Sequence, residues 1–279
     1  MNSLSENTLA LINKTTLGAI EVSPIGAFDD NYIWYIEDTE TQQCWIVDPG
    51  SAEPVLKTLK SLNNKSLSGI LVTHHHHDHI GGIDQILKVF PDTPVYGVKS
   101  DRVPQVSMFV AEGDTLELSA NLTFEIISVT GHTRDHIAYF SKNSKHSFLF
   151  SGDTLFVAGC GRLFEGSAEQ MLSSLKKLKA LPANTVNFCA HEYTLNNLKF
   201  AEAVEPANQD IQEFKHSCIE LRNNNKPTVP TTIQQELLIN PFLRWNDPAV
   251  MTKAAELAEK PVLNDVETFA QIRLWKNRF

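Results

Sequence analysis

The most constraining feature of this sequence is the histidine-rich segment 73–79 (THHHHDH), which directly follows the apolar run 69–72 (GILV). The length and composition of that run predict a fully buried strand. A purification tag would stand at a terminus, whereas this segment is internal and continuous with a strand. A surface cluster of histidines would not be expected to include Asp78 and to end in the glycine pair at 81–82. The segment therefore predicts a metal site.

The order of residues in this segment predicts two metal ions rather than one. Alternate residues of an extended chain point to the same side, so His74 and His76 share one side, and His75 and His77 the other. Asp78 and His79 stand where the chain turns toward a helix, and they can face a second point. Imidazole and carboxylate ligands together suit Zn, Fe or Mn.

Composition limits the other functions that the chain could have. It has 279 residues and a net charge of −9, with 33 acidic and 24 basic residues. This charge disfavours nucleic acid as a partner, because phosphate binding requires a basic surface. We expect no membrane span, because no apolar run is long enough, and no signal sequence within residues 1–16. The four cysteines are widely spaced, which favours free thiols and a cytoplasmic protein.

The pattern of apolar residues changes near residue 191. Before it, short runs of strand type alternate with a few helices. Residues 48–50 (DPG) form a turn, and the helix after it has Val55, Leu56, Leu59 and Leu62 on one face. A second helix carries Ile83, Ile86, Leu87 and Phe90, and the capping box Ser167–Gln170 begins a third. After it, only helical patterns are found. We therefore predict an extension over residues 1–16, a strand-rich domain over 17–191 and an all-helical domain over 192–279.

Three further strand ends carry residues that can bind a metal. They place His132 in GHTRDH (131–136), Asp153 in SGDT (151–154) and His191 in AHEY (190–193). A single His or Asp after a strand is more often a turn or core residue. Four strand ends that each present His or Asp favour a shared site, because functional residues collect at such loops.

Several longer segments resemble a known family. HxHxDH at 74–79, followed by His132, Asp153 and His191, is similar to the metallo-β-lactamase superfamily. Within it, the sequence resembles the hydroxyacylglutathione hydrolases, also called glyoxalase II. The segments that carry this resemblance are AFDDNYIW (27–34), THHHHDH (73–79), GHTRDH (131–136), GDTLFVAGCGRLFEG (152–166), HEYTLNNLKFA (191–201), NPFLRWND (240–247) and IRLWKNRF (272–279).

The resemblance implies an α/β fold: an αββα sandwich of two mixed β-sheets flanked by helices, followed by an all-helical domain. It implies that His74, His76 and His132 bind the first metal ion. Asp78, His79 and His191 would bind the second, and Asp153 would bridge both. Zn is the first expectation for both ions, with Fe or Mn as alternatives. His136 is expected to support a ligand rather than to be one.

The resemblance also implies a thioester hydrolase. A hydroxide bridging the metals would convert S-(2-hydroxyacyl)glutathione, such as S-D-lactoylglutathione, to glutathione and a 2-hydroxy acid such as D-lactate. This is the second step of methylglyoxal detoxification. Asp78 and Asp153 would be the catalytic carboxylates, and a monomer is expected. The expected substrate-binding residues are Arg162, Leu163, Phe164, His191, Glu192, Tyr193, Asn197, Arg273 and Lys276.

The sequence also departs from the family pattern at positions 162 and 164 and allows three alternative functions to be weighed. The family often has Lys and Tyr where this chain has Arg162 and Phe164, so a hydroxyl to bind substrate is missing at position 164. Persulfide dioxygenases share HxHxDH but use one iron ion, and the full set Asp78, His79 and His191 argues against them. A nucleic-acid hydrolase is disfavoured by the acidic charge, and a non-catalytic metal-binding protein by the complete set of ligands.

Overall fold

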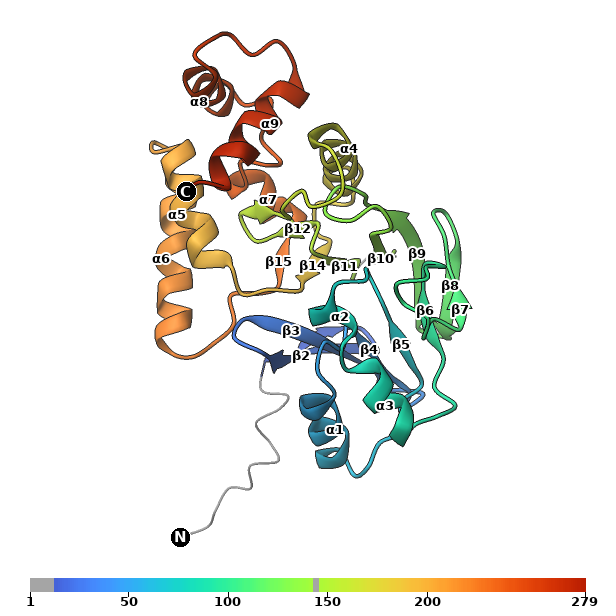
Figure 1. Ribbon diagram of the computed structural model, residues 1–279. Helices are drawn as coiled ribbons and strands as arrows, with labels where there is room; N and C mark the ends of the chain where they lie inside the picture. Colours follow the sequence, from blue (N-terminus) through green and yellow to red (C-terminus); the bar gives the residue numbers. More distant parts are fainter. Residues whose placement is uncertain (1–12, 143–145) are drawn as a thin grey trace. The chain divides into compact units, whose positions relative to one another are not determined.

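The computed structural model describes residues 13–142 and 146–279 and divides into two compact units (Figure 1). Unit 1 comprises Met1–Ser128 and Ile137–Gly152, and unit 2 comprises Val129–His136 and Asp153–Phe279. Each unit is described by itself. Residues 1–12 of the predicted extension lie outside the described part, and strand β1 begins within its remainder, at Thr15.

Unit 1 contains a seven-stranded mixed sheet in the order β1 to β7. The first four strands are antiparallel, and β4 to β7 run parallel to one another. Their bounds are β1 Thr15–Leu17, β2 Ile20–Ala27, β3 Asn31–Asp38, β4 Cys44–Val47, β5 Gly69–Leu71, β6 Val95–Gly97 and β7 Met108–Phe109. The parallel part places the ends of β4 and β5 side by side, and the histidine segment follows β5.

A second sheet of unit 1 packs on the first and consists of antiparallel strands. They are β8 Thr115–Ser119, β9 Leu122–Ser128, β10 Ile137–Ser141 and β11 Phe148–Gly152. The two sheets meet through aromatic side chains: the rings of Trp34 and Phe150 are 6.5 Å apart. The Tyr139 hydroxyl donates to the carbonyl of Val72, 3.0 Å away, and thereby fixes the chain just before the histidines.

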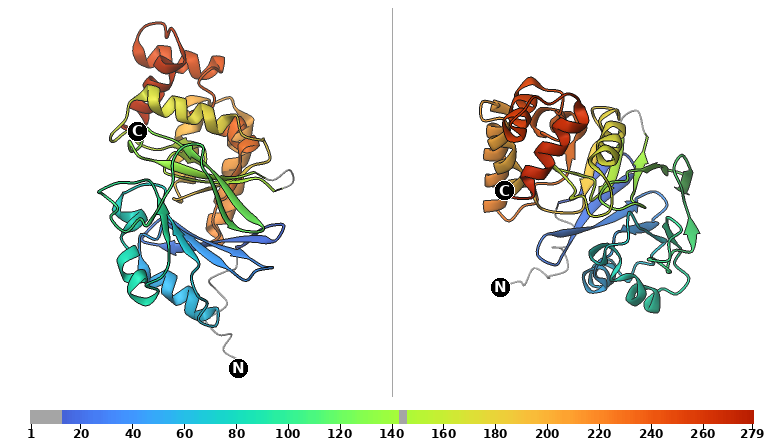
Figure 2. Two further views of the ribbon diagram at one scale, coloured as in Figure 1. Left: turned by 90° about the vertical axis from the view of Figure 1, so that its right-hand side faces the viewer. Right: turned by 45° about the horizontal axis from the view of Figure 1, so that its top comes forward.

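Helices cover the other face of the seven-stranded sheet, as the left view of Figure 2 shows. They are α1 Ala52–Ser61, α2 His77–Ile80 and α3 Ile83–Val89. Val55 and Leu59 of α1 and Ile86 of α3 are buried against strand residues in one apolar cluster, as their predicted helical spacing requires. Unit 1 thus supplies one helical layer and two sheet layers of the predicted sandwich.

Unit 2 is mainly helical (Figure 2). Its helices are α4 Ala168–Lys179, α5 Thr194–Val204, α6 Gln209–Asn223, α7 Ile233–Ile239, α8 Pro248–Ala258 and α9 Asp265–Lys276. Its short strands are β12 Leu155–Phe156, β13 Gly159–Cys160, β14 Val186–Cys189 and β15 Thr231–Thr232. The predicted capping box of α4 is present, with both hydrogen bonds between Ser167 and Gln170. After His191 the chain is helical apart from β15, which pairs with β14 and was not predicted.

Among the described residues, no helix combines the length and the apolar character needed to cross a membrane. The four cysteines are free and buried, as predicted.

Candidate metal and substrate site

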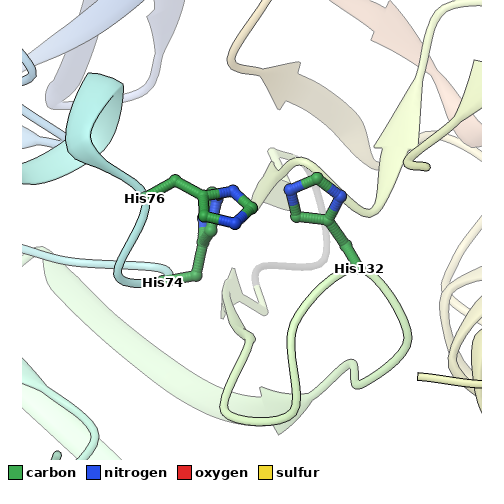
Figure 3. Close-up of side chains that lie close together, drawn as sticks. All are labelled: His74, His76 and His132. Atoms are coloured by element: carbon green, nitrogen blue, oxygen red, sulfur yellow. The ribbon is translucent and has the colours of Figure 1, made fainter. Parts of the chain in front are cut away.

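In unit 1, the histidine segment brings two ligand nitrogens together. β5 ends at Leu71, and the extended chain then carries His74 and His76 with Nε2 of the first 3.1 Å from Nδ1 of the second. The predicted shared side of these two residues is therefore confirmed. Figure 3 draws both rings, which come from this segment, together with His132, which comes from the loop after β9.

Asp48 fixes the orientation of two of these histidines from the end of β4. Its carboxylate accepts the backbone N–H of Thr73 at 2.8 Å and the Thr73 hydroxyl at 2.6 Å. The same carboxylate accepts Nδ1–H of His79 at 3.0 Å, and the Thr73 hydroxyl oxygen accepts Nδ1–H of His74 at 3.1 Å. Both imidazoles thus carry a proton on Nδ1, which leaves Nε2 as the nitrogen that can bind a metal.

The Asp78 carboxylate is oriented by a residue from another strand. Nδ2 of Asn31, the first residue of β3, donates to Oδ2 of Asp78 at 3.0 Å. The same oxygen is 3.5 Å from Nε2 of His79. Gly50 allows this arrangement, because a Cβ atom there would lie 1.9 Å from the Asp78 carbonyl oxygen. Neither Asp48 nor Asn31 was predicted to support the site. The signal in the sequence that could have indicated this role is the position of each residue beside the end of a strand.

The remaining histidines of the segment point elsewhere. Nε2 of His75 is 2.8 Å from the Arg102 guanidinium, and His77 is exposed at the start of α2. This agrees with the prediction that they do not share the side of His74 and His76.

In unit 2, Asp153 lies between two histidines. Its Oδ2 is 3.4 Å from Nε2 of His132, and its Oδ1 is 3.3 Å from Nε2 of His191. All three side chains are buried. Each carboxylate oxygen thus faces a different imidazole, which is the arrangement needed by a carboxylate that bridges two ions.

The backbone fixes the unit 2 ligands. Nδ1–H of His132 donates to the Arg162 carbonyl at 2.8 Å, which directs Nε2 to the side of Asp153. The Asp153 N–H donates to Nε2 of His136 at 3.1 Å, so His136 supports a candidate ligand as expected. Gly161 permits this close packing, because a Cβ atom there would lie 2.0 Å from the Asp153 carbonyl oxygen.

The spacing of these atoms fits metal coordination within each unit. Two ligand atoms bound at about 2.1 Å to one tetrahedral ion lie about 3.4 Å apart. Each candidate pair lies close to this separation: 3.1 Å for His74 with His76, 3.5 Å for Asp78 with His79, and 3.4 and 3.3 Å for Asp153 with its two histidines. The donor set of neutral imidazoles and carboxylates suits Zn, Fe or Mn.

Two aromatic side chains of unit 2 pack on candidate ligands. The Tyr193 ring stacks on that of His191 with 4.6 Å between centroids, and the Phe164 ring meets that of His132 edge-on at 5.3 Å. The Arg162 guanidinium lies over the exposed Phe164 ring, with Leu163 between them in sequence. Phe164 therefore contributes an apolar surface where a tyrosine would offer a hydroxyl.

The predicted cations of α9, Arg273 and Lys276, belong to unit 2, as do Cys160 and Arg162. Nη1 of the buried Arg273 donates to the Cys160 carbonyl at 2.8 Å, and its Nη2 donates to Oδ1 of Asn277 at 3.2 Å. Arg162 reaches the same oxygen at 3.5 Å. The ammonium of Lys276 lies 4.9 Å from the centroid of a phenylalanine ring, and burial followed by repulsion from Arg273 lowers its pKa to about 8.

Two predicted substrate-binding residues make structural hydrogen bonds. The Glu192 carboxylate accepts from the backbone N–H and the hydroxyl of Thr228. Nδ2 of the buried Asn197 donates to the Val157 carbonyl at 3.0 Å. These bonds occupy part of the polar groups that a substrate would need.

A separate hollow of about 640 Å³ in unit 2 contains none of these residues. The Arg244 guanidinium in its wall is engaged by Glu205 at 2.8 Å and by Asp247 at 2.7 Å. The hollow therefore offers no chemistry of the kind that the histidine and aspartate clusters offer.

Comparisons with known proteins show the family to which the chain belongs. A family model described as Metallo-beta-lactamase superfamily matches residues 26–191, and one described as Hydroxyacylglutathione hydrolase C-terminus matches residues 192–279. Two relatives named hydroxyacylglutathione hydrolase are similar over almost their whole length. That of Aliivibrio salmonicida is 48% identical over 258 residues (92% of this chain, 99% of the relative), and that of Hahella chejuensis is 46% identical over 259 residues (93% and 99%).

Solved structures share the fold at lower identity. ETHE1 from Myxococcus xanthus matches with a TM-score of 0.58 and 24% identity over 88% of this chain and 85% of its own. The BLEG-1 B3 metallo-β-lactamase matches with a TM-score of 0.58 and 24% identity over 80% and 99%. The predicted fold class is therefore confirmed.

Proposed function

Because the chain belongs to the hydroxyacylglutathione hydrolase family within the metallo-β-lactamase superfamily, we propose that it hydrolyses the thioester of S-(2-hydroxyacyl)glutathione. The expected substrate is S-D-lactoylglutathione, and the products are glutathione and D-lactate, in the second step of methylglyoxal detoxification. The observation that carries this proposal is similarity over more than nine-tenths of the chain, together with the preorganised His and Asp clusters.

We assign the ligands of two metal ions as follows. His74, His76 and His132 (Figure 3) would bind the first ion, Asp78, His79 and His191 the second, and Asp153 both. The hydrogen bonds that Nδ1 of His74, His79 and His132 makes, which leave Nε2 as the nitrogen for a metal, support this assignment, as does the position of Asp153 between two histidines. Zn is the first candidate for both ions, with Fe or Mn as alternatives.

When bound, such a metal pair supplies Lewis acidity and an activated water at neutral pH. The residues of the chain would orient the reactants around it. Asp153 would bind both ions, and Asp78, whose carboxylate accepts a hydrogen bond from Asn31, would accept a proton from the activated water. The leaving group is a thiolate whose conjugate acid has a pKa near 8.5, so it requires no protein acid.

Glutathione carries carboxylates, and the cations of unit 2 would bind them despite the net charge of −9. Arg273 and Lys276 lie on α9, and Arg162 reaches the same Asn277 oxygen as Arg273. Tyr193 would contact the peptide backbone of the substrate. Leu163 and Phe164 would line the site with apolar surface, and His191, Glu192 and Asn197 would complete it.

The remaining assignments follow from the same proposal. Residues 17–191 would form the catalytic domain and 192–279 the substrate-binding domain, after the extension 1–16. A cytoplasmic monomer without nucleic-acid or membrane partners fits the acidic composition and the small substrate.

The decisive experiment is hydrolysis of S-D-lactoylglutathione, followed by thiol release, with metal content measured on the same sample. We expect turnover and about two metal ions per chain. Oxygen consumption with glutathione persulfide, one bound iron ion and no thioester hydrolysis would refute the proposal in favour of a dioxygenase.

A further inference from the structure

A short hairpin in unit 2 connects the candidate metal ligand Asp153 to the candidate substrate residue Arg162. β12 and β13 pair through Leu155 with Cys160 and through Phe156 with Gly159, which leaves a two-residue turn. Each end of the hairpin is connected to a candidate metal ligand. Asp153 stands before its first strand, and the carbonyl of Arg162, after its second strand, accepts a hydrogen bond from Nδ1–H of His132. A displacement of the hairpin would therefore displace two ligands.

The end of α7 binds the turn of this hairpin. Oε2 of Glu236 accepts the Ala158 N–H at 2.9 Å. Nδ2 of Asn240 donates to the carbonyls of Phe156 at 3.2 Å and Gly159 at 3.0 Å, and to Oε2 of Glu236 at 2.8 Å. Glu236 and Asn240 are both completely buried, so water does not compete for these bonds.

Side chains from other elements of unit 2 bind the carbonyls that remain. Asn187 of β14 donates to Leu155 at 3.1 Å, and Asn197 of α5 donates to Val157 at 3.0 Å. Arg273 of α9 donates to Cys160 at 2.8 Å. Every residue from 155 to 160 thus has a backbone group bound by one of five side chains, Asn187, Asn197, Glu236, Asn240 and Arg273, which we call the hairpin clamp.

The hairpin cannot hold this position through its own bonds. Two strands of two residues each form too small a ladder to be stable alone. Ala158 also has a φ of +52°, a conformation that costs a non-glycine residue energy unless its surroundings enforce it. A leucine at 236 would fill a buried site without the cost of desolvating a carboxyl group. The carboxylate and the carboxamide at these positions are explained by the groups that they bind on the hairpin.

We propose that Glu236 and Asn240 are positioning residues for the metal centre: through the hairpin they set the orientation of Asp153 and of His132. The helical segment after His191 would thus orient metal ligands as well as bind substrate. This proposal rests on the assignment of Asp153 and His132 as ligands under the proposed function. It adds to that function a role for residues that touch neither metal nor substrate.

The test compares metal affinity in variants of the full chain. Zinc binding to metal-free protein is measured by competition with a chelating dye for Asn240→Leu, Glu236→Leu and Glu236→Gln. We expect the two leucine variants to lose roughly 10- to 100-fold in affinity, as is typical for groups that orient ligands. Glu236→Gln keeps an acceptor for the Ala158 N–H and should bind zinc within about threefold of the wild type.

Asn208→Ala is the matched control. It also removes a carboxamide that binds a backbone carbonyl, that of Leu238 in α7, and it removes the N-cap of α6, but Asn208 makes no hydrogen bond in the described structure to the hairpin or to the side chains of Glu236 and Asn240. It should lose stability without losing metal affinity. Leucine variants that fold and bind zinc as tightly as Asn208→Ala would overturn the proposal.

A wild-type measurement covers the case in which the leucine variants do not fold. Coupling between two sites is reciprocal, so zinc binding must slow hydrogen exchange at the Ala158 amide. Exchange at Ala158 that is the same with and without zinc would overturn the proposal. Protein that shows this coupling and binds two ions but does not hydrolyse S-D-lactoylglutathione would refute the proposed function and retain the clamp.

Discussion

Glu236 allows a quantitative prediction, because it is a completely buried carboxyl group whose ionisation burial opposes. Its hydrogen bonds come from Ala158, Thr231 and Asn240 and lower its pKa, but desolvation is the larger effect and raises the pKa from 4.5 to about 7. In the described part of the chain, the groups that shift this pKa include no cation. Burial, with smaller contributions from nearby carboxylates that include Glu236, raises the pKa of the Cys189 and Cys218 thiols to about 12, so both are neutral near pH 7.

The direction in which stability changes with pH follows from proton binding in the folded and unfolded states. The folded protein retains the Glu236 proton up to about pH 7, whereas the unfolded chain releases it near pH 4.5. The stability that this proton contributes is complete below pH 4.5 and is lost as the pH rises through about 7. A shift of about 2.5 units at about 1.36 kcal/mol each corresponds to roughly 3 kcal/mol. Glu236→Gln, which cannot ionise, should avoid this loss.

The assay is thermal unfolding of zinc-loaded wild type and Glu236→Gln at several values from pH 5 to pH 8. The two proteins should unfold at similar temperatures at pH 5. At pH 8 the variant should unfold roughly 6 to 12 °C higher, from about 2 to 4 °C per kcal/mol. Other titrating groups are common to both proteins and cancel in the difference.

Glu205→Gln serves as the control for this comparison. Glu205 is also buried in unit 2, but its carboxylate is paired with Arg244 at 2.8 Å. Removing one partner of such a pair leaves the other charge uncompensated, so this variant should be less stable than the wild type at pH 8. Parallel curves for the wild type and Glu236→Gln across the pH range would refute the desolvation argument.

Three further variants and one treatment test the proposed site. Lys276 should lose its proton near pH 8, so KM for the thioester should rise above that pH in the wild type and stay constant to pH 9 in Lys276→Arg. Steady-state kinetics at each pH measure this, and a KM that stays constant in the wild type would contradict it. Asp78→Ala should bind about one metal ion and lose more than the roughly 10- to 100-fold in kcat that an outer-shell partner costs, and full activity with two ions would exclude it as ligand and base. Asp48→Asn should weaken metal binding roughly 10- to 100-fold, which a dye competition assay measures against wild type, because the anion that holds His79 is lost. Removal of metal by a chelator should abolish hydrolysis, and Zn, Fe or Mn should restore it; activity that survives complete removal would contradict a metal-dependent mechanism.

Local sequence patterns predicted most of the fold. The buried strand before the histidines, the capping box of α4 and the apolar face of α1 depend on neighbours in sequence, and all are present. The pairs β12–β13 and β14–β15 were not predicted, because two-residue strands have no period of their own and exist only through their partners. Helix α7 lies in the segment predicted to be helical but was not predicted as a separate helix.

In the candidate site, too, some residues could be predicted from the sequence and others could not. Alternation along an extended chain was sufficient to place His74 with His76. Strand ends indicated His132, Asp153 and His191 as further candidates, and family resemblance supplied their assignment to two ions. Asp48 was read as part of a turn, and nothing within its neighbourhood in sequence indicates that it binds Thr73 and His79, 25 and 31 residues away. Groups that orient ligands are determined by tertiary contacts, so a sequence pattern centred on the ligands does not contain them.

The histidine segment and the hairpin clamp represent two solutions to one physical problem. A metal ligand needs a fixed tautomer and a fixed direction, and an isolated loop provides neither. In unit 1, Asp48 provides both over a short range, because the parallel strands β4 and β5 end side by side. In unit 2, Asp153 follows a strand but leads into a hairpin too small to hold itself, and the helices after His191 supply the missing bonds. If this reasoning holds, the helical segment cannot be removed without loss of metal affinity, even with a substrate small enough not to need its cations.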